Sequence, residues 1–310
     1  MDVNIIGVPT FYGCDKLGPQ LGPDKLRQKG VISQIKKYNH NVFDLGNIYV
    51  KQVDDSDKFL SNPNMKYFAE LVEINKNLAH SVNCSLKSGC FPFIVGGDHS
   101  IALGSISGVS KYFNKNLAIV WFDAHGDINT FETSESKNVH GMPLASLMGY
   151  GDETFKNLYY NDIKINEDNV YHIGGRDIDS GEKSFIENTN MNMFYPKDLK
   201  EKGLDSVINN ILNNLNNKNI NAIHISFDLD FIDSKYVPGT GTRVENGFTV
   251  DESKYLLKKL VESGLVKSMD LVKLNPILDV DDTTSNIALD IIDTVFKNIS
   301  KIFLIIMYYE

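Results

Sequence analysis

The sequence predicts an α/β fold built around a doubly wound, mostly parallel β-sheet. Short apolar runs without regular polar alternation are typical of strands that are covered on both faces. Longer segments with helical periodicity lie between them, and such alternation of strand and helix is typical of a parallel sheet. No repeat and no linker rich in proline, glycine and serine interrupts this pattern. We therefore expect residues 1–310 to form a single domain.

The predicted elements follow one another along the whole chain. Strands are expected at Val3–Val8, Pro92–Val95, Leu117–Asp123, Asn169–Gly174, Ala222–Asp228 and Ser268–Leu274. The main helices are expected at Asp24–Tyr38, Lys66–Leu86, Leu204–Leu215, Val250–Glu262 and Ser285–Ile299. Thr249 or Asp251 can cap the helix that begins at Val250. An apolar C-terminal tail follows at about residues 300–310, and we expect it to be buried, to contact another subunit or to be a sticky end.

Composition and charge narrow the classes of partner. A net charge of −9 argues against a nucleic-acid partner, because phosphates would be repelled. Three cysteines without a CxxC spacing indicate neither a disulfide framework nor a thiolate zinc site, which favours a reducing cytoplasm. The first residues lack a signal region, and no apolar run reaches the roughly 20 residues that cross a bilayer. We expect a cytoplasmic protein that has no membrane partner.

Three predicted strands end in polar residues of unusual composition. The first is followed by Gly96-Gly97-Asp98-His99-Ser100, the second by Asp123-Ala124-His125-Gly126-Asp127, and the third by Asp228-Leu229-Asp230. The carboxyl ends of parallel strands are where function gathers in such sheets. Alternate residues share one side if the backbone stays extended, which would group the polar side chains of each motif.

These motifs together predict a binuclear metal site. Two imidazoles and four carboxylates at neighbouring strand ends would be poorly solvated and mutually repulsive without a cation. The set contains oxygen and nitrogen ligands but no thiolate, which favours Mn²⁺ over structural zinc. Six ligands are too many for one ion with an open position, so two ions that share aspartates are expected. Each motif alone is also compatible with an ordinary turn or loop. The predicted ligands are His99, Asp123, His125, Asp127, Asp228 and Asp230.

The same motifs resemble the three signatures of the ureohydrolases, the arginase and agmatinase family. The resembling segments are Gly96–Ser100, Trp121–Asn129 and Ser226–Asp230, and the likeness extends over nearly the whole chain, including Gly7-Val8-Pro9, Gly22-Pro23 and Leu271–Pro276. The resemblance implies a three-layer α/β/α fold, two manganese ions per chain and homo-oligomers, either trimers or hexamers. It also implies hydrolysis of a guanidine C–N bond with release of urea.

The resemblance assigns roles to the ligands and to two catalytic side chains. His99, Asp123, Asp127 and Asp228 would hold one ion, and Asp123, His125, Asp228 and Asp230 the other. Metal coordination lowers the pKa of water towards neutrality, so hydroxide is present at working pH. Asp127 would hold this hydroxide by a hydrogen bond. His140 matches a histidine that shuttles a proton, and it would protonate the leaving amine.

Within the family the chain is most similar to arginase, which predicts a binding site for an amino-acid head group. By position, Asn129, Ser136 and Asn138 would contact the carboxylate of the substrate, and Asp179 its ammonium group. Further substrate contacts are predicted at Ser134, where arginases usually have threonine, at Glu182, three residues after Asp179, and at Thr242, in a retained Thr-Gly-Thr segment. For each of these residues, an ordinary surface loop is the alternative interpretation.

One position departs from the family pattern. Lys273 stands where family members carry a glutamate that pairs with the guanidinium of the substrate. Lys273 could extend outward beyond the sheet, or it could face the metals and have its pKa lowered by their positive field. Glu245 could pair with Lys273 or replace the missing carboxylate, unless both residues are surface charges.

We therefore expect a manganese-dependent hydrolase of linear guanidines or amidines, with arginine as the first candidate substrate. Because of Lys273, the first alternative is a hydrolase of the same fold that acts on a different substrate, such as agmatine or another amidine or amide. The second alternative is a catalytically weak metal-binding relative.

Overall fold

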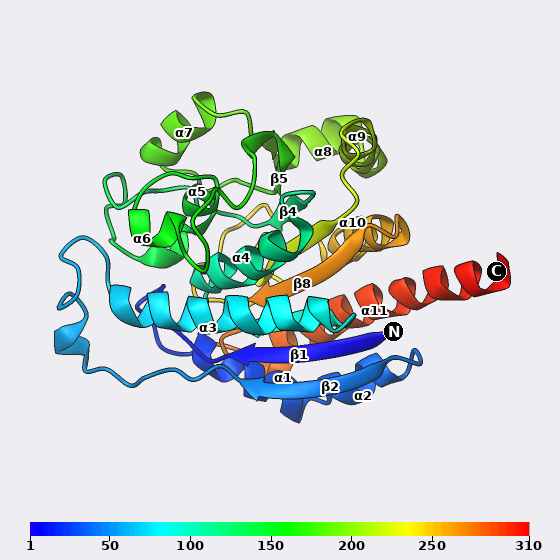
Figure 1. Ribbon diagram of the computed structural model, residues 1–310, viewed down its shortest axis with the longest axis horizontal. Helices are drawn as coiled ribbons and strands as arrows, with labels where there is room; N and C mark the ends of the chain where they lie inside the picture. The colour runs from blue at the N-terminus through cyan, green and yellow to red at the C-terminus, as the bar shows by residue number, and fades with distance from the viewer. Residues whose placement is uncertain (310) are drawn as a thin grey trace.

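The computed structural model describes the backbone of residues 1–309 and the side chains of residues 1–299. Its centre is one eight-stranded sheet in the order β2-β1-β3-β8-β7-β4-β5-β6, with all neighbouring strands parallel (Figure 1). The strands are β1 (Asp2–Val8), β2 (Asn41–Asn47), β3 (Phe91–Gly96), β4 (Ala118–Phe122), β5 (Val170–Ile173), β6 (Asn192–Phe194), β7 (Ile223–Asp228) and β8 (Val266–Val272). The predicted doubly wound parallel sheet is confirmed.

Helices cover both faces of the sheet, which gives three layers. One apolar core lies against α1 (Gly22–Gln28), α2 (Val31–Lys36), α8 (Pro196–Lys202), α9 (Leu204–Asn217), α10 (Val250–Glu262) and α11 (Thr283–Tyr309). The other lies against α3 (Phe68–Lys87), α4 (Ala102–Phe113), α5 (Pro143–Leu147), α6 (Glu153–Lys156) and the edge of α7 (Ser180–Glu187). Successive residues of β4 alternate between these cores, so both faces of this strand are apolar.

Two strands and one helix break were not predicted. β2 is an edge strand with mostly exposed side chains, and β6 is an edge strand of only three residues, so neither has the apolar run that marks a buried strand. The predicted helix Asp24–Tyr38 is interrupted between α1 and α2, where Gly30 has φ 86°. That left-handed conformation suits glycine and ends helical geometry locally.

The expectation of continuously apolar strands is wrong for β7 and β8. His224 and Ser226 on β7 alternate with apolar residues and are fully buried. Ser268 and Asp270 do the same on β8. The strands pair in a register that sets His224 beside Ser268 and Ser226 beside Asp270. The two central strands therefore have one apolar face and one polar face.

The C-terminal part of the chain is helical. Helix α11 continues to Tyr309, beyond the predicted end at Ile299. The side chains of the predicted apolar tail, at about 300–310, lie outside the described residues. Within the described part of the chain, no helix combines the length and apolarity needed to span a membrane. Helix α10 begins as predicted: the Thr249 side chain accepts from Glu252 N, and Glu252 reaches back to Thr249 N in a capping box.

Candidate functional site

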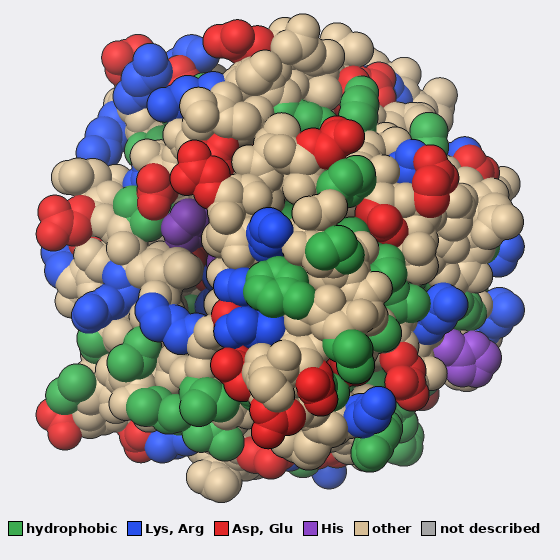
Figure 2. Space-filling view, turned by 90° about the vertical axis from the view of Figure 1, so that its left-hand side faces the viewer, with side chains coloured by type: hydrophobic (Ala, Val, Ile, Leu, Met, Phe, Trp, Pro, Cys, Tyr) green, Lys and Arg blue, Asp and Glu red, His purple; other side chains and the backbone are tan. Residues whose placement is uncertain are grey.

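The predicted metal ligands gather at the carboxyl edge of the four central strands. His99 follows β3, Asp123 follows β4, and Asp228 ends β7. Lys273 follows β8, which lies between β3 and β7 in the sheet. Figure 2 views the molecule from this side and shows a histidine recessed among acidic and basic side chains.

The backbone around these ligands is tightly turned and not extended. A side chain at Gly97 would meet the carbonyl oxygen of Thr10 at 2.1 Å, so only glycine allows the close turn that precedes His99. Asp127 has φ 52°, and Asp228 caps a 3₁₀ turn that contains Asp230. The prediction assumed an extended backbone, in which alternate residues share a side. That assumption is wrong. The side chains converge because of these turns.

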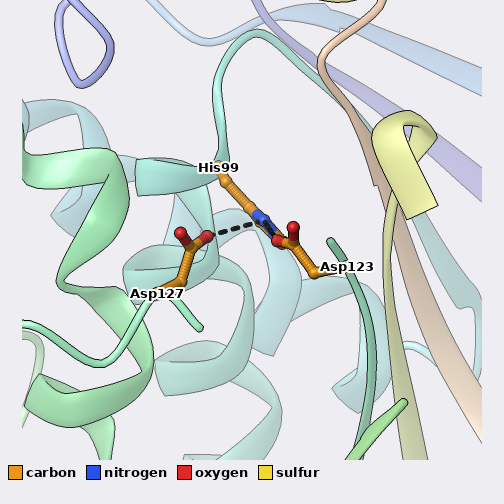
Figure 3. Close-up of side chains that lie close together, drawn as sticks. All are labelled: His99, Asp123 and Asp127. Atoms are coloured by element: carbon orange, nitrogen blue, oxygen red, sulfur yellow. Dashed lines mark hydrogen bonds and ion pairs between the residues drawn. The ribbon is translucent and has the colours of Figure 1, made fainter. Parts of the chain in front are cut away.

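His99, Asp123 and Asp127 form the first group of potential ligands (Figure 3). His99 Nδ1 lies 2.8 Å from Asp123 Oδ2 and 2.9 Å from Asp127 Oδ2. Asp228 Oδ2 is 3.4 Å from the same nitrogen. One ring nitrogen carries at most one proton, so it cannot satisfy three carboxylate oxygens.

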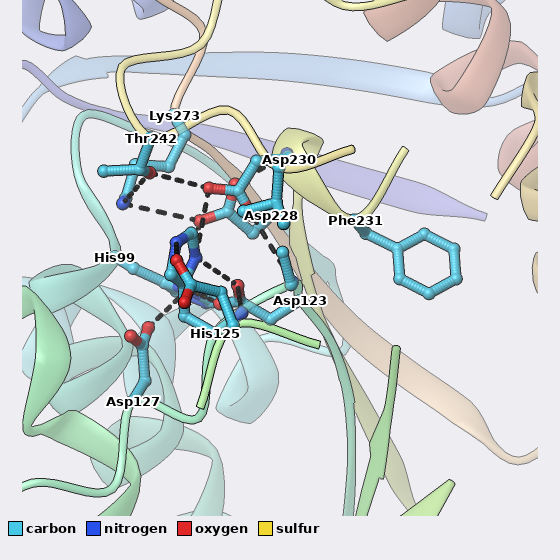
Figure 4. Close-up of polar contacts among 12 residues, drawn as sticks. His99, Asp123, His125, Asp127, Asp228, Asp230, Phe231, Thr242 and Lys273 are labelled. Carbon is cyan, nitrogen blue, oxygen red and sulfur yellow. Dashed lines mark hydrogen bonds and ion pairs between the residues drawn. The ribbon is translucent and has the colours of Figure 1, made fainter. Parts of the chain in front are cut away.

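Asp123, His125 and Asp230 form the second group (Figure 4). His125 Nδ1 lies 3.2 Å from Asp123 Oδ1 and 3.4 Å from Asp230 Oδ2. Asp123 thus offers one oxygen to each group, which is the geometry of a bridging ligand. Thr242 Oγ1 donates to Asp230 Oδ2 at 2.8 Å and orients that carboxylate.

The protein does not supply a hydrogen-bond donor for every oxygen of the buried carboxylates. Asp127 Oδ2 and Asp228 Oδ2 are buried and accept no hydrogen bond. Burial and the nearby Asp230 raise the pKa of Asp228 to about 8, and burial and Asp123 raise the pKa of Asp127 to about 6. Crowded, unpaired oxygens of this kind fit divalent cations, which would compensate their charge.

Comparison with known proteins agrees with this geometry. The profile of the arginase family matches residues 1–297. An arginase of Staphylococcus aureus is 40% identical over 294 residues, covering 95% of this chain and 96% of that protein. An arginase of Brevibacillus brevis is 38% identical over 295 residues, covering 95% and 97%. The crystal structure of Bacillus subtilis arginase superposes with a TM-score of 0.88 at 34% identity, covering 95% and 98%.

The chain belongs to the arginase family. It is accordingly a metal-dependent hydrolase that acts on a guanidine C–N bond. The predicted three-layer fold of this family is also confirmed by the superposition.

Two of the residues predicted to hold the head group in this arginase-family site contact each other. Asn129 Nδ2 donates to Asp179 Oδ2 at 2.8 Å. Asp179 also caps helix α7, in a capping box with Glu182. Glu182 is buried, and burial together with Asp127 raises its pKa to about 7. Glu182 accepts from Ile128 N and so anchors the chain next to Asp127, whereas Asp179 is the more exposed of the two carboxylates.

The other predicted head-group residues lie on one loop. Ser134 Oγ accepts from Lys137 N, and Ser136 Oγ accepts from Asn138 N, so both hydroxyls shape the turn. The Asn138 side chain is already engaged, since its oxygen accepts from Lys66 and its nitrogen donates to Cys14 O. The serines keep hydroxyl groups at the surface of the loop, whereas Asn138 fixes the loop to the body of the protein.

Lys273 points into the site, which decides against its outward orientation (Figure 4). It is 2% exposed and has φ 69°, a left-handed backbone conformation that turns the side chain away from the end of β8. Its Nζ lies 3.0 Å from His140 Nδ1, 3.2 Å from Thr242 Oγ1 and 3.7 Å from Asp228 Oδ2.

The charge of Lys273 is set by opposing effects. Burial lowers its pKa, but Asp228, Asp230 and the other carboxylates of the site outweigh burial and raise the pKa above its ordinary value. The predicted lowering assumed the field of bound metals, so it stays a prediction for the metal-bound site. Burial and Lys273 hold the pKa of His140 well below its ordinary value, so Lys273 donates to a neutral imidazole.

Glu245 does not compensate for Lys273. Its side chain is exposed, and its backbone oxygen accepts from Arg176 Nε at 3.1 Å. The partners of Lys273 are His140, Thr242 and Asp228. Neither the predicted pairing with Lys273 nor the replacement of the missing carboxylate is supported by this arrangement.

Two side chains that hold this site together were not predicted from the sequence. Arg176 is half-buried among backbone carbonyls and donates to Asp230 O at 2.7 Å and Val244 O at 3.1 Å. Trp121 stacks on the His99 ring at 4.1 Å between centroids and donates to Asp123 Oδ2. Trp121 could have been noticed, because it is the only tryptophan and lies two residues before a predicted ligand.

Proposed function

We propose that this chain is a manganese-dependent arginase that hydrolyses arginine to ornithine and urea. The observation that carries the proposal is a pair of ligand groups that share Asp123, next to buried oxygens of Asp127 and Asp228 that accept no hydrogen bond. The relatives that are named arginases support arginine as the substrate.

The proposed ligand sets follow the two groups. His99, Asp123, Asp127 and Asp228 would hold one Mn²⁺, and Asp123, His125, Asp228 and Asp230 the other. Oxygen and imidazole ligands without thiolates favour manganese. When bound, the ions would provide hydroxide at neutral pH and stabilise negative charge in the transition state.

The side chains around the metals would position and protonate the substrate. The free Asp127 oxygen can orient the attacking water by a hydrogen bond. His140 accepts from Lys273 at Nδ1, so a proton for the leaving amine would come from Nε2. Asn129 and Asp179, with the hydroxyls of Ser134 and Ser136, would hold the amino-acid head group.

Lys273 favours a second candidate function. A buried ammonium 3.7 Å from Asp228 would repel a guanidinium, and it would suit an amidine or amide whose reacting end carries negative charge. This candidate keeps the fold, the metals and the hydrolytic chemistry, and it changes only the substrate.

The test combines metal analysis with substrate assays. Protein purified with Mn²⁺ should contain two ions per chain and release more urea from arginine than from agmatine or other guanidines. Hydrolysis of another amidine or amide in preference to arginine would establish the second candidate. Two bound ions without hydrolysis of any substrate would refute both and indicate a metal-binding relative.

The proposal includes a single domain over residues 1–310, a trimeric or hexameric homo-oligomer and a cytoplasmic location. Light scattering of the full chain would test the oligomer. Limited proteolysis would test the single domain, and cell fractionation would test the location.

A further inference from the structure

We propose that Asp270 is a positioning residue that acts through Ser226 to fix the proton of His99 on Nε2 and so controls the affinity of the adjacent metal position. This inference rests on the metal-binding part of the proposed function and not on the identity of the substrate. The residues that carry it lie on the polar faces of β7 and β8, beneath helix α4.

Asp270 is a fully buried carboxylate that accepts three hydrogen bonds. Its Oδ1 accepts from Ser226 Oγ at 2.6 Å. Its Oδ2 accepts from Ser105 Oγ at 2.5 Å and lies 3.0 Å from His224 Nε2. Ser268 Oγ lies 2.8 Å from the other ring nitrogen of His224, so this histidine can donate to Asp270 from Nε2. Both oxygens of Asp270 are therefore occupied by donors.

The direction of these bonds determines the protonation of His99. An ionised carboxylate only accepts, so the hydroxyl proton of Ser226 points to Asp270. Ser226 Oγ also lies 2.8 Å from His99 Nε2, and its proton is already used. The ring must therefore donate from Nε2. Nδ1, the ring nitrogen that is left to bind a metal, then faces the oxygens of Asp123, Asp127 and Asp228.

A ring nitrogen that faces several carboxylate oxygens is an arrangement that a cation would stabilise. Metal-binding histidines commonly donate their other ring nitrogen to a carboxylate, which fixes the tautomer and strengthens the ligand. Here a serine lies between the ring and the carboxylate. His125 has no comparable support, since its Nε2 is 3.8 Å from Asp177, whose side chain is 69% exposed. Asp270 should therefore act mainly on the ion held by His99.

The asparagine variant of Asp270 removes this directionality. An asparagine can present its amide donor to Ser226, which frees the serine proton for His99 Nε2 and moves the ring proton to Nδ1. A protonated Nδ1 cannot bind a metal. We expect Asp270→Asn to weaken one Mn²⁺ position about 10- to 100-fold, the usual effect of losing such a partner. Ser226→Ala should have a similar effect.

The experiment titrates Mn²⁺ alone into metal-free full-length protein. Equilibrium dialysis gives the number of ions and their affinities, and the emission of Trp121 reports on the first group, because this single tryptophan stacks on His99. Ser107→Ala is the control for the serine variant, since Ser107 is buried in α4 and makes no hydrogen bond. Asp293→Asn is the control for Asp270→Asn, since Asp293 accepts from Gln34 and Tyr38 on the opposite face.

The expected pattern separates positioning from a general loss of structure. At a Mn²⁺ concentration that only just saturates the parent, Asp270→Asn and Ser226→Ala should each retain close to one ion, and both controls should retain close to two. The double variant should match the weaker single variant within about twofold, because both changes interrupt one chain of hydrogen bonds. Thermal unfolding of the metal-free proteins should show that the variants are folded. If Asp270→Asn does not fold, the inference is tested by comparing the Mn²⁺ affinity of Ser226→Ala with that of Ser107→Ala.

Several outcomes would overturn the inference. One is that Asp270→Asn or Ser226→Ala binds Mn²⁺ as tightly as the parent. Another is that the losses of affinity in the two single variants multiply in the double variant, as they would for independent sites. A parent that binds no Mn²⁺ would overturn the inference together with the metal part of the proposed function. If the parent binds two ions and the variants lose one as expected, but the parent releases no urea from arginine, only the proposed arginase activity is refuted.

Discussion

Replacing Lys273 with glutamate should raise urea production from arginine at least tenfold. The ammonium of Lys273 is directed into the metal site, where it would face the guanidinium of a bound substrate. A carboxylate at this position can accept two parallel hydrogen bonds from a guanidinium, which orients the group as well as attracting it. The reacting carbon would then be held more often in the productive position.

The magnitude follows from the distances in the site. Lys273 Nζ lies 3.7 Å from Asp228 Oδ2, and the side chain is 3% exposed. At such a distance and an effective dielectric constant of ~20, two unit charges interact by about 4.5 kcal/mol. A guanidinium at a similar distance would be repelled to that extent. Relief of a third of this repulsion, ~1.5 kcal/mol, corresponds to about a tenfold gain in binding.

The assay is steady-state urea release from arginine by the Mn²⁺-loaded parent and variants. Lys273→Glu should lower KM and raise kcat/KM, and Lys273→Met, which removes the charge without adding a carboxylate, should lie between. Glu245→Ala is the control for the competing idea and should change little, because Glu245 is exposed and is not a partner of Lys273. If the parent is already a fast arginase and neither change at Lys273 alters kcat/KM, Lys273 does not repel the substrate.

Three further predictions concern the ligands, the proton donor and the scaffold. Asp123→Ala and Asp228→Ala should each lose both Mn²⁺ ions in metal analysis, because each carboxylate is proposed to bridge; full metal content in both would disprove bridging. His140→Asn keeps an acceptor for Lys273 and should retain metal while lowering kcat by ~10²–10⁴. Normal turnover by that variant would exclude a proton-transfer role. Thr249→Ala should lower the free energy of unfolding by about 1 kcal/mol in denaturant titrations, because it removes the cap of α10. An unchanged midpoint would show that the cap contributes nothing.

Much of the fold could be predicted because burial leaves a local trace in the sequence. Strands covered on both faces are mostly apolar, so β1, β3, β4 and β5 were located to within a few residues. The edge strands β2 and β6 are only partly covered, so their sequences carry no such trace. The cap of α10 could be narrowed to Thr249 or Asp251 because capping residues lie directly at the start of a helix.

The candidate ligands could be named from the sequence, because each motif directly follows a strand and the ends of parallel strands meet at one edge. The contacts of the surrounding side chains became clear only from the folded chain. The left-handed backbone at Lys273 directs its ammonium to His140, 133 residues away in the sequence, and leaves Glu245 at the surface. The register of β7 and β8 likewise joins Ser226 to Asp270. Such contacts depend on the pairing of distant segments, which no local pattern of residues records.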